Sequence, residues 1–121
     1  MKRLPDSELE IMLVIWEAET SVNSDYILER IHRDWTKTTL LNLLARLCGR
    51  GFLECRKVGR QNIYTPIVDK EKYLQAESRS FLKRVYHNSL THLVSSLYDG
   101  NSISKEDLAE LKTFIEETED A

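Results

Sequence analysis

The side chains best suited to binding a polyanion gather between residues 30 and 66. This segment carries eight basic residues and two acidic ones, a net charge of +6, whereas residues 67–121 carry a net charge of −4. Such an asymmetry indicates that one part of the chain meets a polyanion, although an ordinary solvated surface would show the same charges. The basic residues of the segment are Arg30, Arg33, Lys37, Arg46, Arg50, Arg56, Lys57 and Arg60.

No pattern typical of an enzyme or a metal site accompanies these charges. The two cysteines, Cys48 and Cys55, form no CxxC motif, and His32, His87 and His92 are too scattered for paired helical metal ligands. Neighbouring carboxylates on a helix point apart, and the glycines form no phosphate-binding loop. We therefore expect no enzymatic activity, no cofactor and no metal. Both cysteines are expected to be small buried side chains.

Length and composition limit the architecture. The chain has 121 residues, of which 41% are hydrophobic and 31% charged, as expected for one ordinary domain or two small subdomains. No apolar run approaches the ~20 residues that a membrane-spanning helix needs, and the first residues do not resemble a signal peptide. We expect a cytoplasmic protein without membrane insertion.

Three helices are predicted in the first 50 residues. A capping box of Ser7 and Glu10 would begin the first helix, which runs to about Ala18. Asn23 or Ser24 would cap the second. Thr36 would cap the third, which ends at Gly49 or Gly51. The apolar stripe of the third helix is Leu40, Leu43, Leu44 and Leu47.

The periodicity then changes from helical to alternating. Residues 52–58 and 62–66 are predicted to be two strands, joined by a turn in which Gly59 takes a positive φ. The segment 21–22 would add a short third strand at one edge. Because two strands alone are marginally stable in water, the hairpin must pack against the helices.

The remaining residues are predicted to form three amphipathic helices in a unit too small to bury its own apolar stripes. Asp69 would cap the first of these helices, and a capping box of Ser104 and Asp107 would begin the last. A second copy of the chain would cover them in a symmetric homodimer. We assign residues 1–68 to a winged-helix DNA-binding domain and residues 69–121 to a helical dimerisation domain. The expected dimerisation residues are Leu74, Phe81, Leu82, Val85, Leu90, Leu93, Val94, Leu97, Leu108, Leu111 and Ile115.

The predicted fold is mainly α with a small β-hairpin wing, an N-terminal winged helix-turn-helix followed by the dimerisation helices. A recognition helix at about 36–50 would enter the major groove of double-stranded DNA, and the wing at 53–66 would contact the flanking backbone. The candidate DNA-binding residues are Thr36, Lys37, Thr38, Thr39, Asn42, Arg46, Arg50, Lys57, Arg60 and Gln61.

Several of these residues also have a purely structural interpretation. Thr36 would serve only as the helix cap, and Thr39 would bond within the preceding turn. Arg46 would pair with Glu54, or with an acidic residue of the first helix, in place of DNA. A protein-interaction module that binds an acidic partner is the competing function.

Three stretches resemble the penicillinase and methicillin-resistance repressors of the BlaI/MecI/CopY family: LPDSELEIMLVIWE at 4–17, WTKTTLLNLLARL at 35–47 and GFL at 51–53. The resemblance implies a homodimeric repressor that binds palindromic operators containing TACA and TGTA. Thr39 and Arg46 match residues of the family's recognition helix. Asn42 stands where the family usually has threonine, and Leu41 where it often has a basic residue.

The resemblance also bears on regulation. It implies control of an antibiotic-resistance operon or of a stress- or metal-response operon. The β-lactam-responsive members of the family are cut at an Asn-Phe bond by a membrane sensor protease. The resemblance therefore implies such a protease as a further partner for this chain. Ser96-Leu97 occupies the corresponding place here, and no cysteine follows Cys55, unlike the C-terminal cysteine cluster of the copper-responsive members.

Overall fold

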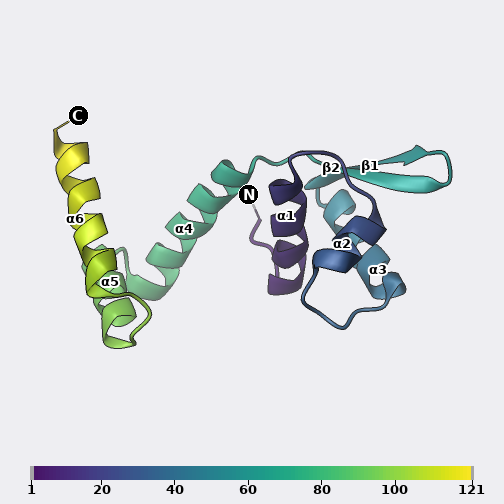
Figure 1. Ribbon diagram of the computed structural model, residues 1–121. Coiled ribbons are helices and arrows are strands. Elements are labelled where there is room, and N and C mark those ends of the chain that lie inside the picture. The colour runs from purple at the N-terminus through teal and green to yellow at the C-terminus, as the bar shows by residue number, and fades with distance from the viewer. Residues whose placement is uncertain (1, 121) are drawn as a thin grey trace. The chain divides into compact units, whose positions relative to one another are not determined.

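A computed structural model describes residues 2–120, in which six helices and one hairpin follow one another along the chain (Figure 1). This order confirms the predicted fold class. The elements are α1 (Asp6–Ala18), α2 (Ser24–Arg30), α3 (Lys37–Gly49), β1 (Leu53–Val58), β2 (Gln61–Pro66), α4 (Lys70–Tyr86), α5 (Leu90–Asp99) and α6 (Lys105–Glu119).

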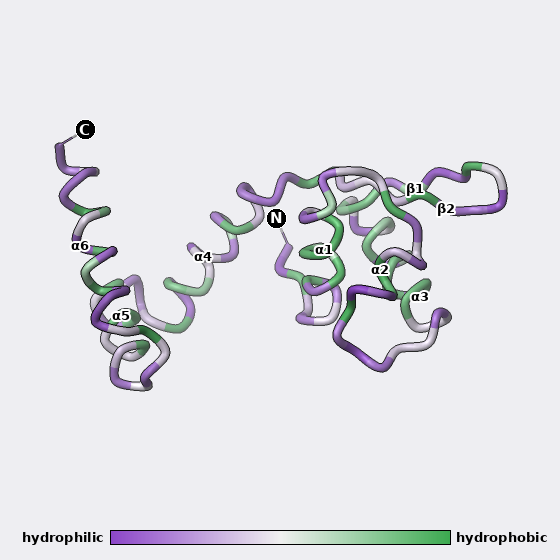
Figure 2. Tube along the Cα trace, viewed as in Figure 1, coloured by the Kyte–Doolittle hydropathy of each residue, from purple (hydrophilic) through white to green (hydrophobic). Residues whose placement is uncertain are grey.

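The chain forms two compact units, the first ending at Glu77 and the second beginning at Ser78. The first unit contains the hydrophobic core, and α1, the most continuously apolar helix in Figure 2, supplies three of its fully buried side chains. The core residues are Leu4, Ile11, Met12, Ile15, Val22, Ile27, Ile31, Leu40, Leu44, Leu47, Phe52, Leu53, Tyr64 and Tyr73. Because Tyr73 belongs to this core, the first turn of α4 is part of the first unit.

Helix capping follows the sequence at α2, α3 and α4 but not at α1. Asn23, Thr36 and Asp69 each accept a hydrogen bond from the backbone N–H three residues ahead, as a cap does. The predicted capping box at Ser7 is wrong, because α1 begins at Asp6 after Pro5 and has no side-chain cap. Pro5 instead offers its carbonyl to the N–H of Leu9, which completes the first turn.

The end of α3 is a glycine motif at Gly51, one of the two predicted stops. The N–H of Gly51 donates to the carbonyl of Cys48 at 3.1 Å, and the N–H of Phe52 donates to that of Leu47 at 3.0 Å. This pair of bonds defines a Schellman motif, which needs a left-handed residue, and Gly51 has φ +81°. The motif turns the chain directly from α3 into β1.

The hairpin pairs β1 with β2 in antiparallel register, with Cys55 opposite Tyr64 and Val58 opposite Gln61. Gly59 has φ +65°, as predicted for the turn. The predicted third strand is reduced to one bridge, in which Val22 and Tyr64 exchange hydrogen bonds of 3.1 and 2.8 Å. The hairpin projects beyond the helices of the first unit (Figure 1), in the manner of a wing.

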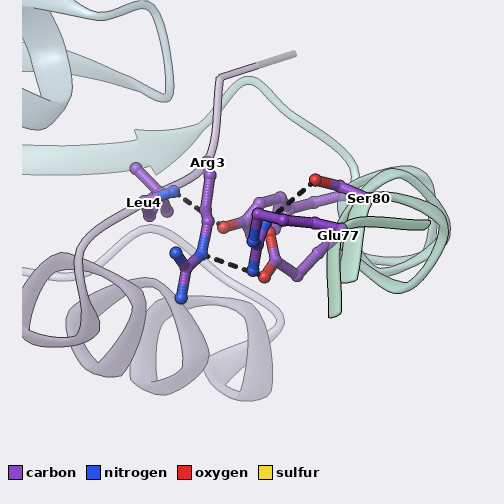
Figure 3. A network of polar contacts seen from close by, with 6 residues as sticks. Arg3, Leu4, Glu77 and Ser80 are labelled. Atoms are coloured by element: carbon purple, nitrogen blue, oxygen red, sulfur yellow. Dashed lines mark hydrogen bonds and ion pairs between the residues drawn. The ribbon is translucent and has the colours of Figure 1, made fainter. Parts of the chain in front are cut away.

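Polar contacts tie both ends of the first unit together. The buried N–H of Leu4 donates to the Tyr73 hydroxyl at 2.9 Å, and Arg3 pairs with Glu77 at 3.2 Å (Figure 3). The indole N–H of Trp16 donates to the carbonyl of Val68 at 2.9 Å, and the Trp16 and Tyr73 rings lie 5.8 Å apart. The N-terminal segment and the start of α4 therefore pack on one core.

The second unit has helices but no interior of its own. None of residues 78–120 is buried, and hydrophobic and hydrophilic residues alternate along α6 (Figure 2). The capping box of Ser104 and Asp107 is present at the start of α6, as predicted. The apolar sides of α5 and α6 line an open groove of about 340 Å³. Among the described residues, no helix is both long and apolar enough to cross a bilayer.

Candidate nucleic-acid interface

The first turn of α3 is held by threonine side chains. Thr36 Oγ1 accepts a hydrogen bond from the Thr39 N–H at 3.2 Å, and the two hydroxyls lie 3.1 Å apart. Thr36 therefore caps the helix and Thr39 bonds back to it, and both exposed side chains lie at the positive end of the helix dipole. Lys37 lies between them in the sequence and pairs with Asp25 of α2 at 3.2 Å, so this turn combines hydrogen-bond donors with an ion pair.

The two sides of α3 differ sharply in burial. Leu40, Leu44 and Leu47 have no exposed surface, which fixes the rotation of the helix against the core. Thr38 and Asn42 therefore face solvent, together with Ala45. These side chains are short, so a flat, bulky surface such as a duplex can approach the α3 backbone closely. Leu41 is 36% exposed beside them.

The wing brings further polar side chains next to the start of α3. Lys37, Arg60 and Gln61 line one hollow of about 200 Å³ together with Asn23 and Leu41. The Asn23 amide donates to Gln61 Oε1 at 3.2 Å, which joins the N-cap of α2 to the wing. The hollow therefore collects polar and cationic groups from α2, α3 and the hairpin within one unit of the molecule, together with the Asp25 carboxylate that pairs with Lys37.

Arg46 and Arg50 have a partner that sequence reasoning did not name. Both guanidinium groups pair with Glu8 of α1, at 3.8 Å from Arg46 and 3.4 Å from Arg50. The interpretation of Arg46 as the partner of an acidic residue of the first helix is therefore confirmed, and Glu54 is not that partner. A signal existed in the sequence, because Glu8 lies three and four residues before Ile11 and Met12, on the buried side of α1.

The ten residues predicted to contact DNA are all exposed, but they do not form one cluster. The structure groups them around the first turn of α3, along its outer side, and on the wing. Lys57 lies on β1, opposite Asn62 and close to the turn at Gly59. Their contact with DNA remains a prediction.

The prediction that both cysteines are buried is wrong for Cys55, which is exposed, while Cys48 is half-buried. On β1 only Leu53 is buried, because the hairpin leaves the core after its first residue. Burial raises the pKa of the Cys48 thiol, and the charge of the nearby Cys55 raises it further. Burial is also the largest cause of the raised pKa of Tyr64, and the charge of Cys55 raises that pKa further.

Residues 2–120 contain no group of three or more histidine, cysteine or acidic side chains arranged to hold a metal ion. Around α3 and the wing, the first unit presents an exposed polar and partly cationic surface. Such a surface suits the phosphate backbone and base edges of nucleic acid.

Comparison with known proteins agrees with this geometry. The model of the penicillinase repressor family matches residues 4–117. The chain belongs to the penicillinase repressor family. The resemblance stated from the sequence is thereby confirmed.

Family members of similar length support the assignment. The chain is 34% identical to the penicillinase repressor of Bacillus licheniformis over 122 residues, covering 97% of this chain and 94% of the relative. It is 24% identical to the methicillin resistance regulatory protein MecI of Staphylococcus aureus (strain N315), covering 93% and 92%.

Solved structures of BlaI are similar to part of the chain. The solution structure of the DNA-binding domain of the repressor BlaI is 35% identical, with a TM-score of 0.52, covering 60% of this chain and 94% of that domain. Monomeric Bacillus licheniformis BlaI in complex with the blaP half-operator is 32% identical, with a TM-score of 0.51, covering 60% and 89%. The chain thus shares the fold of the BlaI DNA-binding domain over 60% of its length.

Proposed function

We propose that this member of the penicillinase repressor family is a transcriptional repressor that binds palindromic operator DNA as a homodimer. The observation that carries the proposal is the outer side of α3, where short polar residues face solvent directly opposite a fully buried leucine stripe. The relative solved on its half-operator supports the same use of the first unit. Thr38 and Asn42 would then meet the major groove, which admits one helix.

The flanking contacts would come from the first turn of α3 and from the wing. Lys37, Arg60 and Gln61 share a hollow beside α3, so they would reach phosphates on the same side of the recognition helix. Lys57 would extend this contact along the hairpin. Arg50 would add a phosphate contact at the far end of α3.

The homodimer would form through the second unit. Leu90, Val94 and Tyr98 of α5 face a groove shared with Leu108, Leu111 and Ile115 of α6, and the groove is open to solvent. Large exposed apolar patches are rare on monomers and typical of interaction surfaces. A second copy would bury these stripes by symmetry, so the interface would lie in the part of the predicted dimerisation domain 69–121 that begins at Ser78.

The regulated genes would belong to an antibiotic-resistance operon or to a stress- or metal-response operon, and the protein would act in the cytoplasm. A membrane sensor protease remains a candidate partner. Ser96 and Leu97 lie inside α5, so a protease would need α5 to unfold locally before it could cut there.

Fluorescence anisotropy with two duplexes tests the function. One duplex carries a TACA/TGTA palindrome and the other a scrambled sequence of equal composition, each titrated at several salt concentrations. We expect the palindrome to bind at least about tenfold more tightly (~1.4 kcal/mol), with a log–log salt slope near −0.9 per phosphate contact. Affinity that is weak, equal for both duplexes and insensitive to salt would refute the proposal and favour a protein-interaction module.

A further inference from the structure

A buried carboxylate lies behind the recognition helix. Glu8 of α1 has no exposed surface, and neither of its carboxylate oxygens has a hydrogen-bond partner among the described residues. Burying a charge is unfavourable unless an opposite charge compensates it. The compensation here comes from Arg46 at 3.8 Å and Arg50 at 3.4 Å, both on α3.

The two arginines continue the outer side of α3. Asn42, Arg46 and Arg50 lie four residues apart, so they follow one another along one side of the helix. The Arg46 side chain is 56% exposed and that of Arg50 31% exposed. A guanidinium group carries five N–H donors, so each arginine that faces Glu8 keeps donors directed toward solvent.

We propose that Glu8 is a positioning residue for DNA sequence recognition. Its buried carboxylate holds the Arg46 and Arg50 guanidinium groups against α1 and thereby fixes which of their donors face the duplex. The inference rests on the proposed DNA-binding function and adds to it a residue that cannot itself touch DNA. Arginine side chains that are already ordered lose less conformational freedom when they bind.

The charge of Glu8 has a second, opposite effect. A negative charge behind α3 weakens the attraction of this surface for any phosphate backbone, whatever the base sequence. Removing the charge should therefore preserve or strengthen binding to unrelated DNA while it loosens the two arginines. A loss of sequence preference without a loss of general affinity distinguishes positioning from a merely structural role.

The test uses the full-length Glu8→Gln variant, which removes the charge and keeps the shape of the side chain. The matched control is Glu10→Gln, also on α1, whose carboxylate pairs with Arg33 at 2.6 Å and not with α3. The probes are the duplex most enriched by wild-type protein from a randomised DNA library and a scrambled version of that duplex. Anisotropy gives both affinities for each variant at one salt concentration.

We expect Glu8→Gln to reduce the preference for the enriched duplex at least fivefold, with unchanged or tighter binding to the scrambled one. Glu10→Gln should keep the wild-type preference. In an Arg46→Ala background, where Arg50 still compensates Glu8, Glu8→Gln should change the preference less than it does alone. An unchanged preference in Glu8→Gln, or an equal loss of affinity for both duplexes, would overturn the inference.

A measurement on the unmodified protein is independent of whether the variant folds. ¹⁵N relaxation of arginine Nε groups should show Arg46 and Arg50 more ordered than Arg60 of the exposed wing turn. Equal mobility of all three would overturn the positioning role and leave the proposed function standing. A library selection in which wild-type protein enriches no sequence would instead overturn the proposed function, and this inference with it.

Discussion

Thr36 caps α3 by accepting a hydrogen bond from the Thr39 N–H. The contribution of this bond to stability can be measured separately from any DNA contact. Thr36→Ala should lower the free energy of unfolding by about 1 kcal/mol, because an orphaned N–H of the first turn loses its partner. Urea denaturation followed by circular dichroism measures the change. Thr38→Ala, an exposed threonine of the same turn, should stay within about 0.5 kcal/mol of wild type. Equal losses in both variants would show that Thr36 is not the cap.

The Tyr73 hydroxyl has a structural function, and a substitution that removes only its oxygen tests that function. Tyr73→Phe should cost about 1–3 kcal/mol of stability, since the buried N–H of Leu4 would lose its acceptor. Thermal denaturation checks this against Tyr26→Phe, which removes the hydroxyl of a half-buried tyrosine of α2 in the same unit. A Tyr73→Phe variant as stable as Tyr26→Phe would mean that water replaces the Tyr73 hydroxyl.

At the scale of elements, two glycines, one at the end of α3 and one in the wing turn, should respond in opposite directions to alanine. A Cβ at Gly49 or at Gly59 would meet nothing within 4 Å, so backbone conformation alone decides each effect. Gly59 has φ +65°, and Gly59→Ala should cost roughly 1–2 kcal/mol in the wing turn. Gly49 ends α3 without a positive φ, and Gly49→Ala should stabilise by about 0.5–1 kcal/mol. Urea denaturation gives the free energy of unfolding of both variants. A change of the same sign in the two variants would contradict this account.

The elements that the sequence predicted well are those with local signals. Leucine spacing defined α3, Asn23, Thr36 and Asp69 capped their helices, and the alternation around Gly59 defined the hairpin. The start of α1 was missed because Pro5 caps it through the backbone, without a side-chain bond.

Features that depend on tertiary packing were harder to predict. Glu8 and Arg50 are far apart in the sequence, and only the packing of α1 against α3 makes Glu8 a buried counter-ion. The exposure of Cys55 depends on where the hairpin leaves the core. The alternation of apolar and polar residues along the strand does not predict that point. The charged surface of α3 and the wing was found from composition, and an acidic partner of Arg46 on the first helix was predicted as one alternative, but neither Glu8 itself nor its pairing with Arg50 was.

At the scale of the whole molecule, the apolar sides of α5 and α6 predict self-association. Ile115 lines the α5–α6 groove and is 45% exposed, so Ile115→Asp should place a charge in the proposed dimer interface. Sedimentation equilibrium should show a dimer for wild type and at least about a tenfold weaker dimer (~1.4 kcal/mol) for Ile115→Asp. Thr113→Asp changes charge equally on the other side of α6 and should remain dimeric. A dimer unaffected by Ile115→Asp would place the interface elsewhere.

The central claim is that α3 and the wing, rather than another surface, receive DNA. Backbone ¹H–¹⁵N chemical-shift mapping of the full chain, with and without a TACA/TGTA duplex, tests it most directly. We predict that the largest shifts fall between Thr36 and Arg50 and between Lys57 and Gln61. Shifts confined to α1 or to α5 and α6, with α3 and the wing unchanged, would contradict the claim.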